Sequence, residues 1–156
     1  ITPLDPLWIP VNKHGSQSAA TARRFEEAFF GDKQILTFPA GLCSRRINGR
    51  IQDTPWKPNF LKKAYASQRE IVPIFCEGRL SNFFYNLSSL RKKLGVKANI
   101  EMLWLPDEMF AQHDRHFRIR VGEPIRLDEL QQVGTLAEQV DWIREKCYEM
   151  EKLLSK

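Results

Sequence analysis

Three short, largely apolar runs stand out in the pattern of hydrophobic and polar positions. They cover Leu7–Val11, Gln34–Phe38 and Ile71–Phe75, and their apolar character indicates buried strands. Pro73 lies inside the third run and predicts a sheet edge or a bulge nearby, because proline cannot donate to a strand ladder. A fourth run, residues 117–121, alternates apolar residues with arginines and predicts a half-exposed strand.

Segments with helical spacing lie between these runs. Ser16 is placed to cap a helix over residues 17–30, and Pro58 suits the first turn of a second helix. A strand, a helix and another strand in so few residues indicate a β-α-β unit with parallel strands. We therefore expect a single α/β domain with a mostly parallel central sheet flanked by helices.

The stretch SNFFYNLSSL, residues 81–90, is rich in aromatic residues. Ser81 can cap a helix here, and an apolar stripe follows at helical spacing: Phe84, Leu87, Leu90 and Leu94. Core packing is the favoured interpretation of this stripe, and contact with a lipid or an acyl chain is the alternative. The charged run at residues 91–93 is expected to be a solvated helix end.

The last helix is the most clearly marked element. Thr135 and Glu138 form a capping box ahead of it. Apolar residues then recur at alternating spacings of four and three: Leu136, Val140, Ile143, Cys147, Met150 and Leu154. Such a stripe is expected to pack on its own domain rather than on a partner helix.

Charge narrows the choice of partners. The chain of 156 residues carries a net charge of +5 and has a pI near 9.2, which favours an anionic partner such as phosphate, nucleic acid or an acidic membrane surface. The three cysteines lie far apart without a C-x-x-C pair, so neither a disulfide framework nor a zinc site is indicated. No apolar run approaches the length of a membrane span.

The loop that follows the second run, LTFPAGLCSRR at residues 36–46, can meet such an anion. Gly41 lets the backbone approach a ligand closely, and Ser44 offers a hydroxyl group. Arg45, Arg46 and Arg50 can hold phosphate oxygens through forked, charge-assisted hydrogen bonds. From the residues alone, a solvated basic turn is an equal alternative.

The same loop resembles the third motif of the glycerophospholipid (lysophospholipid) acyltransferase family, usually written F-P-E-G-T-R-S. Upstream, Lys13 matches a basic position of that family, and IVPI at residues 71–74 resembles its fourth motif. VGEPI at residues 121–125 is similar to the segment that closes the domain. The long loop resembles that of bacterial hemolysin-like and acyltransferase members. Two departures are Ala40, where the family has glutamate, and the displacement of arginine to Arg45.

This resemblance implies transfer of an acyl group from acyl-CoA or acyl-carrier protein to the hydroxyl of a glycerol-phosphate or lysophospholipid acceptor. Neither a metal nor a cofactor is implied. The residues that match the phosphate-binding part of the family are Lys13, Gly41, Ser44, Arg45 and Arg46. Lys13 and Arg45 are the expected primary contacts and Arg46 is secondary, while Gly41 and Ser44 shape the loop.

No catalytic residue is assigned, because the family's H-x-x-x-x-D motif has no match in this sequence. We expect the motif to precede Ile1. On this interpretation residues 1–156 are the C-terminal portion of an acyltransferase-like domain truncated at its N-terminus, inactive in isolation.

Other functions stay open. Ala40 permits a non-catalytic phospholipid- or phosphate-binding domain. The basic pI with interleaved aromatic residues permits nucleic-acid binding, but no such motif is matched and we expect no nucleic-acid partner. His113 and His116 favour a surface pair over a metal site. The scattered cysteines favour a reducing compartment, so we expect a cytoplasmic location, with a peripheral position at the inner face of the membrane as a further expectation.

Overall fold

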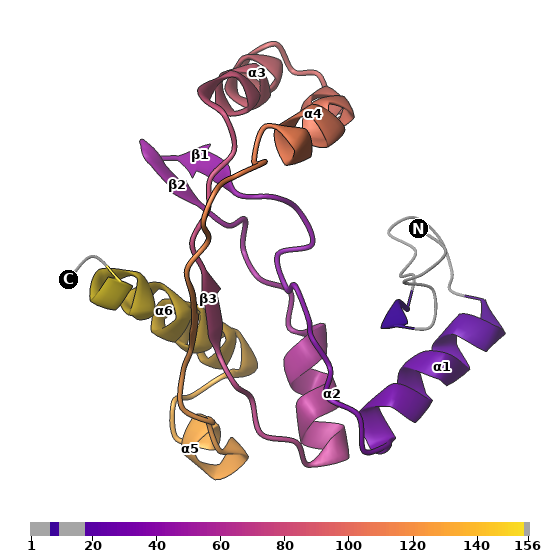
Figure 1. Cartoon of the computed structure of the whole chain (residues 1–156). Coiled ribbons are helices and arrows are strands. Elements are labelled where there is room, and N and C mark those ends of the chain that lie inside the picture. The colour runs from indigo at the N-terminus through magenta and orange to yellow at the C-terminus, as the bar shows by residue number, and fades with distance from the viewer. Residues whose placement is uncertain (1–6, 10–17, 155–156) are drawn as a thin grey trace.

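A computed structural model describes residues 7–9 and 18–154 (Figure 1). Within these residues the chain forms six α-helices, a 3-10 helix and four short strands. In chain order they are α1 (Ala19–Phe30), β1 (Arg45–Ile47), β2 (Arg50–Gln52), α2 (Asn59–Ser67), β3 (Ile74–Cys76), α3 (Asn82–Lys93), η2 (Ile100–Trp104), α4 (Leu105–Phe110), β4 (Ile119–Val121), α5 (Leu127–Gln131) and α6 (Leu136–Leu154).

The expected mostly parallel central sheet is wrong. The described strands form two separate antiparallel pairs, the β1–β2 hairpin and β3 with β4. Residues 7–9 and 34–38 form no strand, and residues 10–11 lie outside the described part of the chain. Leu36 and Phe38 are exposed. An apolar run favours extended backbone, but a strand also needs a hydrogen-bonding partner, and these runs have none among the described residues.

The two predicted strands that do form lie side by side. In the pairing of β3 with β4, Ile74 is opposite Val121 and Cys76 is opposite Ile119. β3 begins directly after Pro73, which fits the rule that proline starts a strand or lies at its edge. A side chain at Gly122 would meet the Pro73 ring at 2.9 Å, so the close approach of the two segments requires a glycine there.

The hydrophobic core lies where α2, α5 and α6 meet. Its fully packed members are Leu61, Ile125, Leu130, Val140 and Ile143. The predicted stripe of α6 is confirmed at its four buried positions, Val140, Ile143, Cys147 and Met150. The burial of Leu154 lies outside the described side chains.

Of the three side-chain caps predicted at helix starts, two agree with the structure. The Thr135 amide donates to the Glu138 carboxylate at 2.7 Å, which confirms the capping box. Ser81 caps α3 by accepting from the Phe84 amide at 3.1 Å. α1 begins later than predicted, because its cap is Ser18 rather than Ser16.

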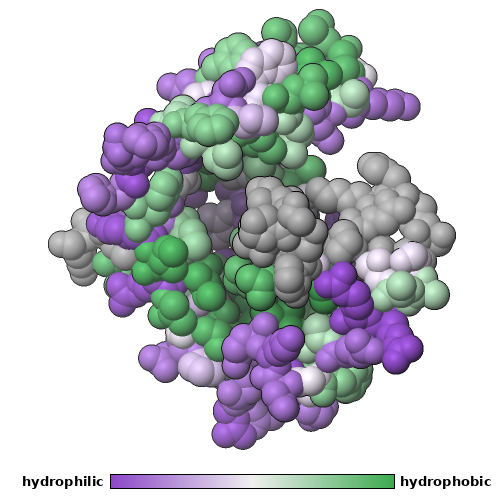
Figure 2. Space-filling model, turned by 45° about the vertical axis from the view of Figure 1, so that its right-hand side comes forward, coloured by the Kyte–Doolittle hydropathy of each residue, from purple (hydrophilic) through white to green (hydrophobic). Residues whose placement is uncertain are grey.

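α3, η2 and α4 pack together at one end of the molecule, at the top of Figure 1. The predicted core stripe of α3 is wrong in its second half, since Phe84 is buried but Leu90 and Leu94 are exposed. Figure 2 shows hydrophobic side chains gathered over this end of the molecule. Among the described residues, no helix is both long enough and apolar enough to cross a membrane.

Candidate functional site

The loop that precedes β1 turns at Gly41. The Gly41 amide donates to the carbonyl oxygen of Phe38 at 3.0 Å, and its φ of +65° lies in the left-handed region that favours glycine. A Cβ atom here would have no neighbour within 4 Å, so the backbone angle, not crowding, explains the glycine. The residues after the turn run against α3.

Ser44, at the end of this loop, and Arg46, in β1, connect this part of the chain to α3. The hydroxyl oxygens of Ser44 and Tyr85 lie 2.9 Å apart, and the Tyr85 hydroxyl also accepts from the Leu80 amide at 3.1 Å. Arg46 donates through Nη1 to Oδ1 of Asn86 at 2.7 Å. Arg46 is exposed, so its guanidinium is accessible from solvent while one of its nitrogens is held.

Arg45, between them, is buried, with 2% of its surface exposed. It donates through Nη2 to Oε1 of Glu101 at 3.0 Å, and through Nη1 to the carbonyl oxygens of Cys43 and Ser44 at 3.0 and 3.1 Å. Its guanidinium also lies over the ring of Phe84, 5.1 Å from the ring centroid. These contacts satisfy the charge and most of the donors of the Arg45 side chain inside the protein.

Glu101 binds a second buried arginine. Its carboxylate is fully buried and lies 2.8 Å from Nε of Arg91, whose Nη1 donates to the Val96 carbonyl at 2.8 Å. We call Arg45, Glu101 and Arg91 the buried triad. It joins β1, η2 and the end of α3 through two positive charges and one negative charge. Because a buried charge is tolerated when it is paired and hydrogen-bonded, the triad holds β1 against α3 and η2.

The structure brings only some of the five residues predicted to bind phosphate close to one another. Lys13 lies outside the described residues. Gly41 shapes the turn, and Ser44, Arg45 and Arg46 come together against α3. Arg46 offers an accessible guanidinium, whereas Arg45 would reach a phosphate only if the buried triad opened. Phosphate binding stays a prediction for this set.

Sequence reasoning missed Glu101 and misplaced Arg91. Arg91 belongs to the charged run that was expected to be solvated, yet it is buried. Glu101 is a lone charge inside the apolar segment 100–104, and that isolation is a signal that could have marked it as buried and paired. The role of Tyr85 could not be separated from the core packing expected of an aromatic-rich helix.

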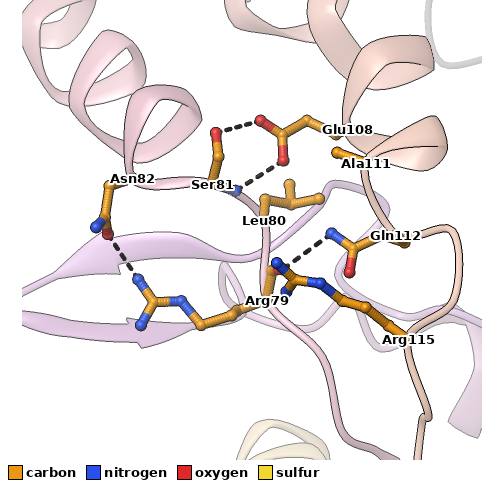
Figure 3. Close-up of a pocket in the computed structure, with 8 residues that line it drawn as sticks. All are labelled: Arg79, Leu80, Ser81, Asn82, Glu108, Ala111, Gln112 and Arg115. Atoms are coloured by element: carbon orange, nitrogen blue, oxygen red, sulfur yellow. Dashed lines mark hydrogen bonds between the residues drawn. The ribbon is translucent and has the colours of Figure 1, made fainter.

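A cavity of about 260 Å³ opens at the start of α3 (Figure 3). The Glu108 side chain reaches across from α4 and accepts from the Ser81 amide at 2.7 Å and from the Ser81 hydroxyl. Arg79 donates to Oδ1 of Asn82 at 2.6 Å. The cavity is lined by Arg79, Leu80, Ser81, Asn82, Glu108, Ala111, Gln112 and Arg115.

Tyr85 connects this cavity to the loop. Its hydroxyl binds the amide of Leu80, which lines the cavity, and the hydroxyl of Ser44, which lies in the loop. The cavity carries the positive charges of Arg79 and Arg115 together with the carboxylate of Glu108. The two guanidinium groups can donate hydrogen bonds to a ligand that carries a negative charge.

The remaining candidate groups stand apart from this site. His113 pairs with Asp114 at 2.8 Å, and both side chains are exposed. Within residues 7–9 and 18–154, no three His, Cys, Asp or Glu side chains come together as a metal ion would require. The thiols of Cys43, Cys76 and Cys147 are free, and burial raises the pKa of Cys147 to about 11.

Comparison with known proteins identifies the family of this chain. The chain matches the acyltransferase family over residues 1–155. It is 42% identical over 147 residues to the lyso-glycine lipid O-acyltransferase of Phocaeicola vulgatus, which covers 94% of this chain and 53% of that protein. It is 41% identical over 147 residues to the protein of the same name from Bacteroides thetaiotaomicron, covering 94% of this chain and 54% of that protein. The chain spans about half the length of these curated relatives. No solved structure matches.

Proposed function

Because this chain belongs to the acyltransferase family, we propose that the complete polypeptide transfers an acyl group from a thioester donor to a hydroxyl group of a lysolipid. The observation that carries the proposal is the match itself, which reaches 41–42% identity over 94% of the chain. Both relatives are named as O-acyltransferases of a lysolipid. The proposed donor is acyl-CoA or acyl-carrier protein.

The proposed reaction forms an ester and breaks a thioester. The acceptor oxygen bonds to the acyl carbon, the carbon–sulfur bond breaks, and the hydroxyl proton ends on the departing thiol. A positioned base that takes this proton typically contributes about 10²–10⁴-fold to the rate. We place that base, a histidine, upstream of Ile1, and assign acceptor binding to the residues described here.

We propose that the loop before β1 and the adjoining residue Arg46 of β1 bind an acidic head group of the acceptor. The exposed guanidinium of Arg46, held by Asn86, is the principal contact. A guanidinium binds phosphate and carboxylate alike through paired hydrogen bonds. A lysophospholipid and a lipid with a glycine head group therefore both suit this contact. The remaining proposed contacts of the head-group site are Lys13, Gly41 and Ser44, and Arg45 supports them from the buried triad.

The buried triad supports this role by preorganisation. Arg45 is fixed by Glu101, and its neighbour Arg46 is thereby held at the surface before a ligand arrives. A side chain that is already ordered loses less conformational entropy on binding, so more of the interaction is available as affinity. Arg45 is thus proposed to act mainly by positioning the loop.

An acyl-transfer assay on the complete polypeptide tests the proposal. The donors are acyl-CoA and acyl-carrier protein, and the acceptors are lyso-glycine lipid, lysophosphatidate and neutral monoacylglycerol. We expect an acidic acceptor to be acylated. Arg46→Gln should raise the KM for that acceptor about tenfold with little change in kcat, because one charge-assisted contact is lost. Lys62→Gln, at an exposed lysine of α2, is the matched control.

Two outcomes contradict parts of this proposal. Failure to acylate any of the three acceptors rejects the enzymatic function, and an inert protein that still binds a lysolipid supports a non-catalytic lipid-binding domain. Equal effects of Arg46→Gln and Lys62→Gln on KM mean that the head group responds to diffuse charge instead of a defined contact.

A further inference from the structure

α3 exposes an apolar stripe on one of its faces. Phe83, Leu87, Leu90 and Leu94 recur at spacings of four, three and four, which places them in one row along the helix. Leu87 is half-buried, whereas Phe83, Leu90 and Leu94 are 53%, 53% and 70% exposed. A different set of α3 residues faces the interior: Phe84, Tyr85, Ser88 and Arg91.

The exposed apolar character continues onto η2 and α4. The rings of Phe83 and Trp104 are in contact, with their centroids 5.6 Å apart. Leu103, Met109 and Phe110 are also largely exposed. Figure 2 shows hydrophobic side chains gathered over this end of the molecule. Large exposed apolar patches mark interaction sites more often than ordinary surface.

Positive charge accompanies this apolar surface. Across residues 79–116 the exposed basic side chains are Arg79, Lys92, Lys93, Lys97 and Arg115. The exposed acidic residues of the same segment are Asp107 and Asp114, since Glu101 and Glu108 are buried. An apolar face on a segment with an excess of exposed lysine and arginine is the combination that binds the interface of an anionic bilayer.

We propose that α3, η2 and α4 form the surface by which this protein contacts an anionic phospholipid membrane. The exposed apolar side chains enter the head-group boundary, and the lysines and arginines bind lipid phosphates. Trp104 is suited to this depth because its ring is amphipathic. The proposal rests on the proposed function, since a lysolipid acceptor resides in a bilayer, and it adds how the protein reaches that acceptor.

The position of Arg46 supports this orientation. Its partner Asn86 lies three residues after Phe83 and four before Leu90, so it is adjacent to the exposed stripe on the helix surface. The guanidinium proposed to bind the acceptor head group is therefore beside the surface proposed to contact the membrane. A lysolipid could present its head group to Arg46 while its acyl chain stays in the bilayer.

Vesicle co-sedimentation of the complete polypeptide tests this surface. The vesicles are pure phosphatidylcholine, or phosphatidylcholine with about one third phosphatidylglycerol. The variant is Leu90→Gln with Leu94→Gln, and the matched control is Phe30→Gln with Leu153→Gln, at positions of similar exposure on α1 and α6. A second variant, Lys92→Gln with Lys93→Gln, tests the charge.

We expect the α3 leucine variant to lower the partition coefficient on anionic vesicles at least tenfold, with the control unchanged. The lysine variant should lower it about fivefold for each lysine and weaken its salt dependence, with little effect on neutral vesicles. Wild-type binding by the leucine variant overturns the proposal. A fall in the Tm of the leucine variant without a change in its vesicle binding also overturns the proposal, because it shows that another part of the polypeptide covers the stripe.

A soluble acceptor separates this test from that of the proposed function. The leucine variant should acylate a short-chain, water-soluble lysolipid at the wild-type rate and lose activity on the same acceptor embedded in vesicles. Absence of acylation with any acceptor rejects the enzymatic function, and the vesicle result then decides the membrane contact by itself.

Discussion

Replacement of Glu101 by glutamine removes the negative charge that lies between two buried guanidinium groups. The Glu101 carboxylate is fully buried and contacts Arg45 at 3.0 Å and Arg91 at 2.8 Å. Glutamine has nearly the same shape and keeps one carbonyl acceptor, so packing changes little. The two arginines, 2% and 7% exposed, then remain buried without a counter-charge.

The expected loss of stability follows from this geometry. Removing one partner of a buried ion pair costs about 3–5 kcal/mol, because the remaining charge is neither solvated nor paired. Domains of this size are stable by roughly 5–15 kcal/mol, and each kcal/mol corresponds to about 2–4 °C in Tm. Glu101→Gln should therefore lower Tm by about 6–20 °C.

Urea and thermal unfolding of the complete polypeptide, followed by circular dichroism, measure this loss. Glu27→Gln is the matched control, because it removes an exposed pair with Arg23 and should leave Tm unchanged within error. Replacing all three triad residues by Met, Leu and Met should recover most of the lost stability, since an apolar cluster needs no counter-charge. A Glu101→Gln protein as stable as wild type would refute the reasoning and show that the triad is hydrated in solution.

Two further predictions concern α6. Thr135→Ala should lower Tm by about 2–4 °C at neutral pH, because it removes a helix cap. Hydrogen bonds from Thr135 hold the pKa of the Glu138 carboxyl below its usual 4.5. Their stabilisation is present above that value and is lost as pH falls through the lowered pKa. A Tm difference between wild type and variant that does not shrink on acidification contradicts this. Burial raises the pKa of Cys147 to about 11, so this thiol should react with iodoacetamide far more slowly than exposed Cys76 until urea unfolds the chain. Peptide mass spectrometry measures the two labelling rates, and equal rates in the folded protein would contradict this prediction.

Features carried by neighbouring residues were predictable from the sequence. The capping box of α6 needs Thr135 and Glu138 three positions apart, and the buried stripe behind it follows from helical periodicity. The Ser81 cap of α3 is equally local. The order of short motifs likewise predicted the acyltransferase family, which the comparisons confirm.

Features that need a distant partner were decided by the tertiary structure. The run at residues 34–38 is apolar enough to suggest a strand, but pairing depends on another segment, and the described strands pair antiparallel elsewhere. The row from Leu87 to Leu94 has helical spacing, but which face of α3 is buried depends on where η2 and β1 pack.

The same distinction between neighbouring residues and long-range contacts applies to the candidate site. The sequence alone identified a loop with a glycine turn and adjacent arginines, because these residues are contiguous. Which arginine is accessible depends on Glu101, which is 56 positions away from Arg45 and buries it, leaving Arg46 at the surface. Guanidinium groups look alike in a sequence, but burial and a counter-charge separate a structural arginine from one that can meet a ligand, and both come from residues brought together by folding.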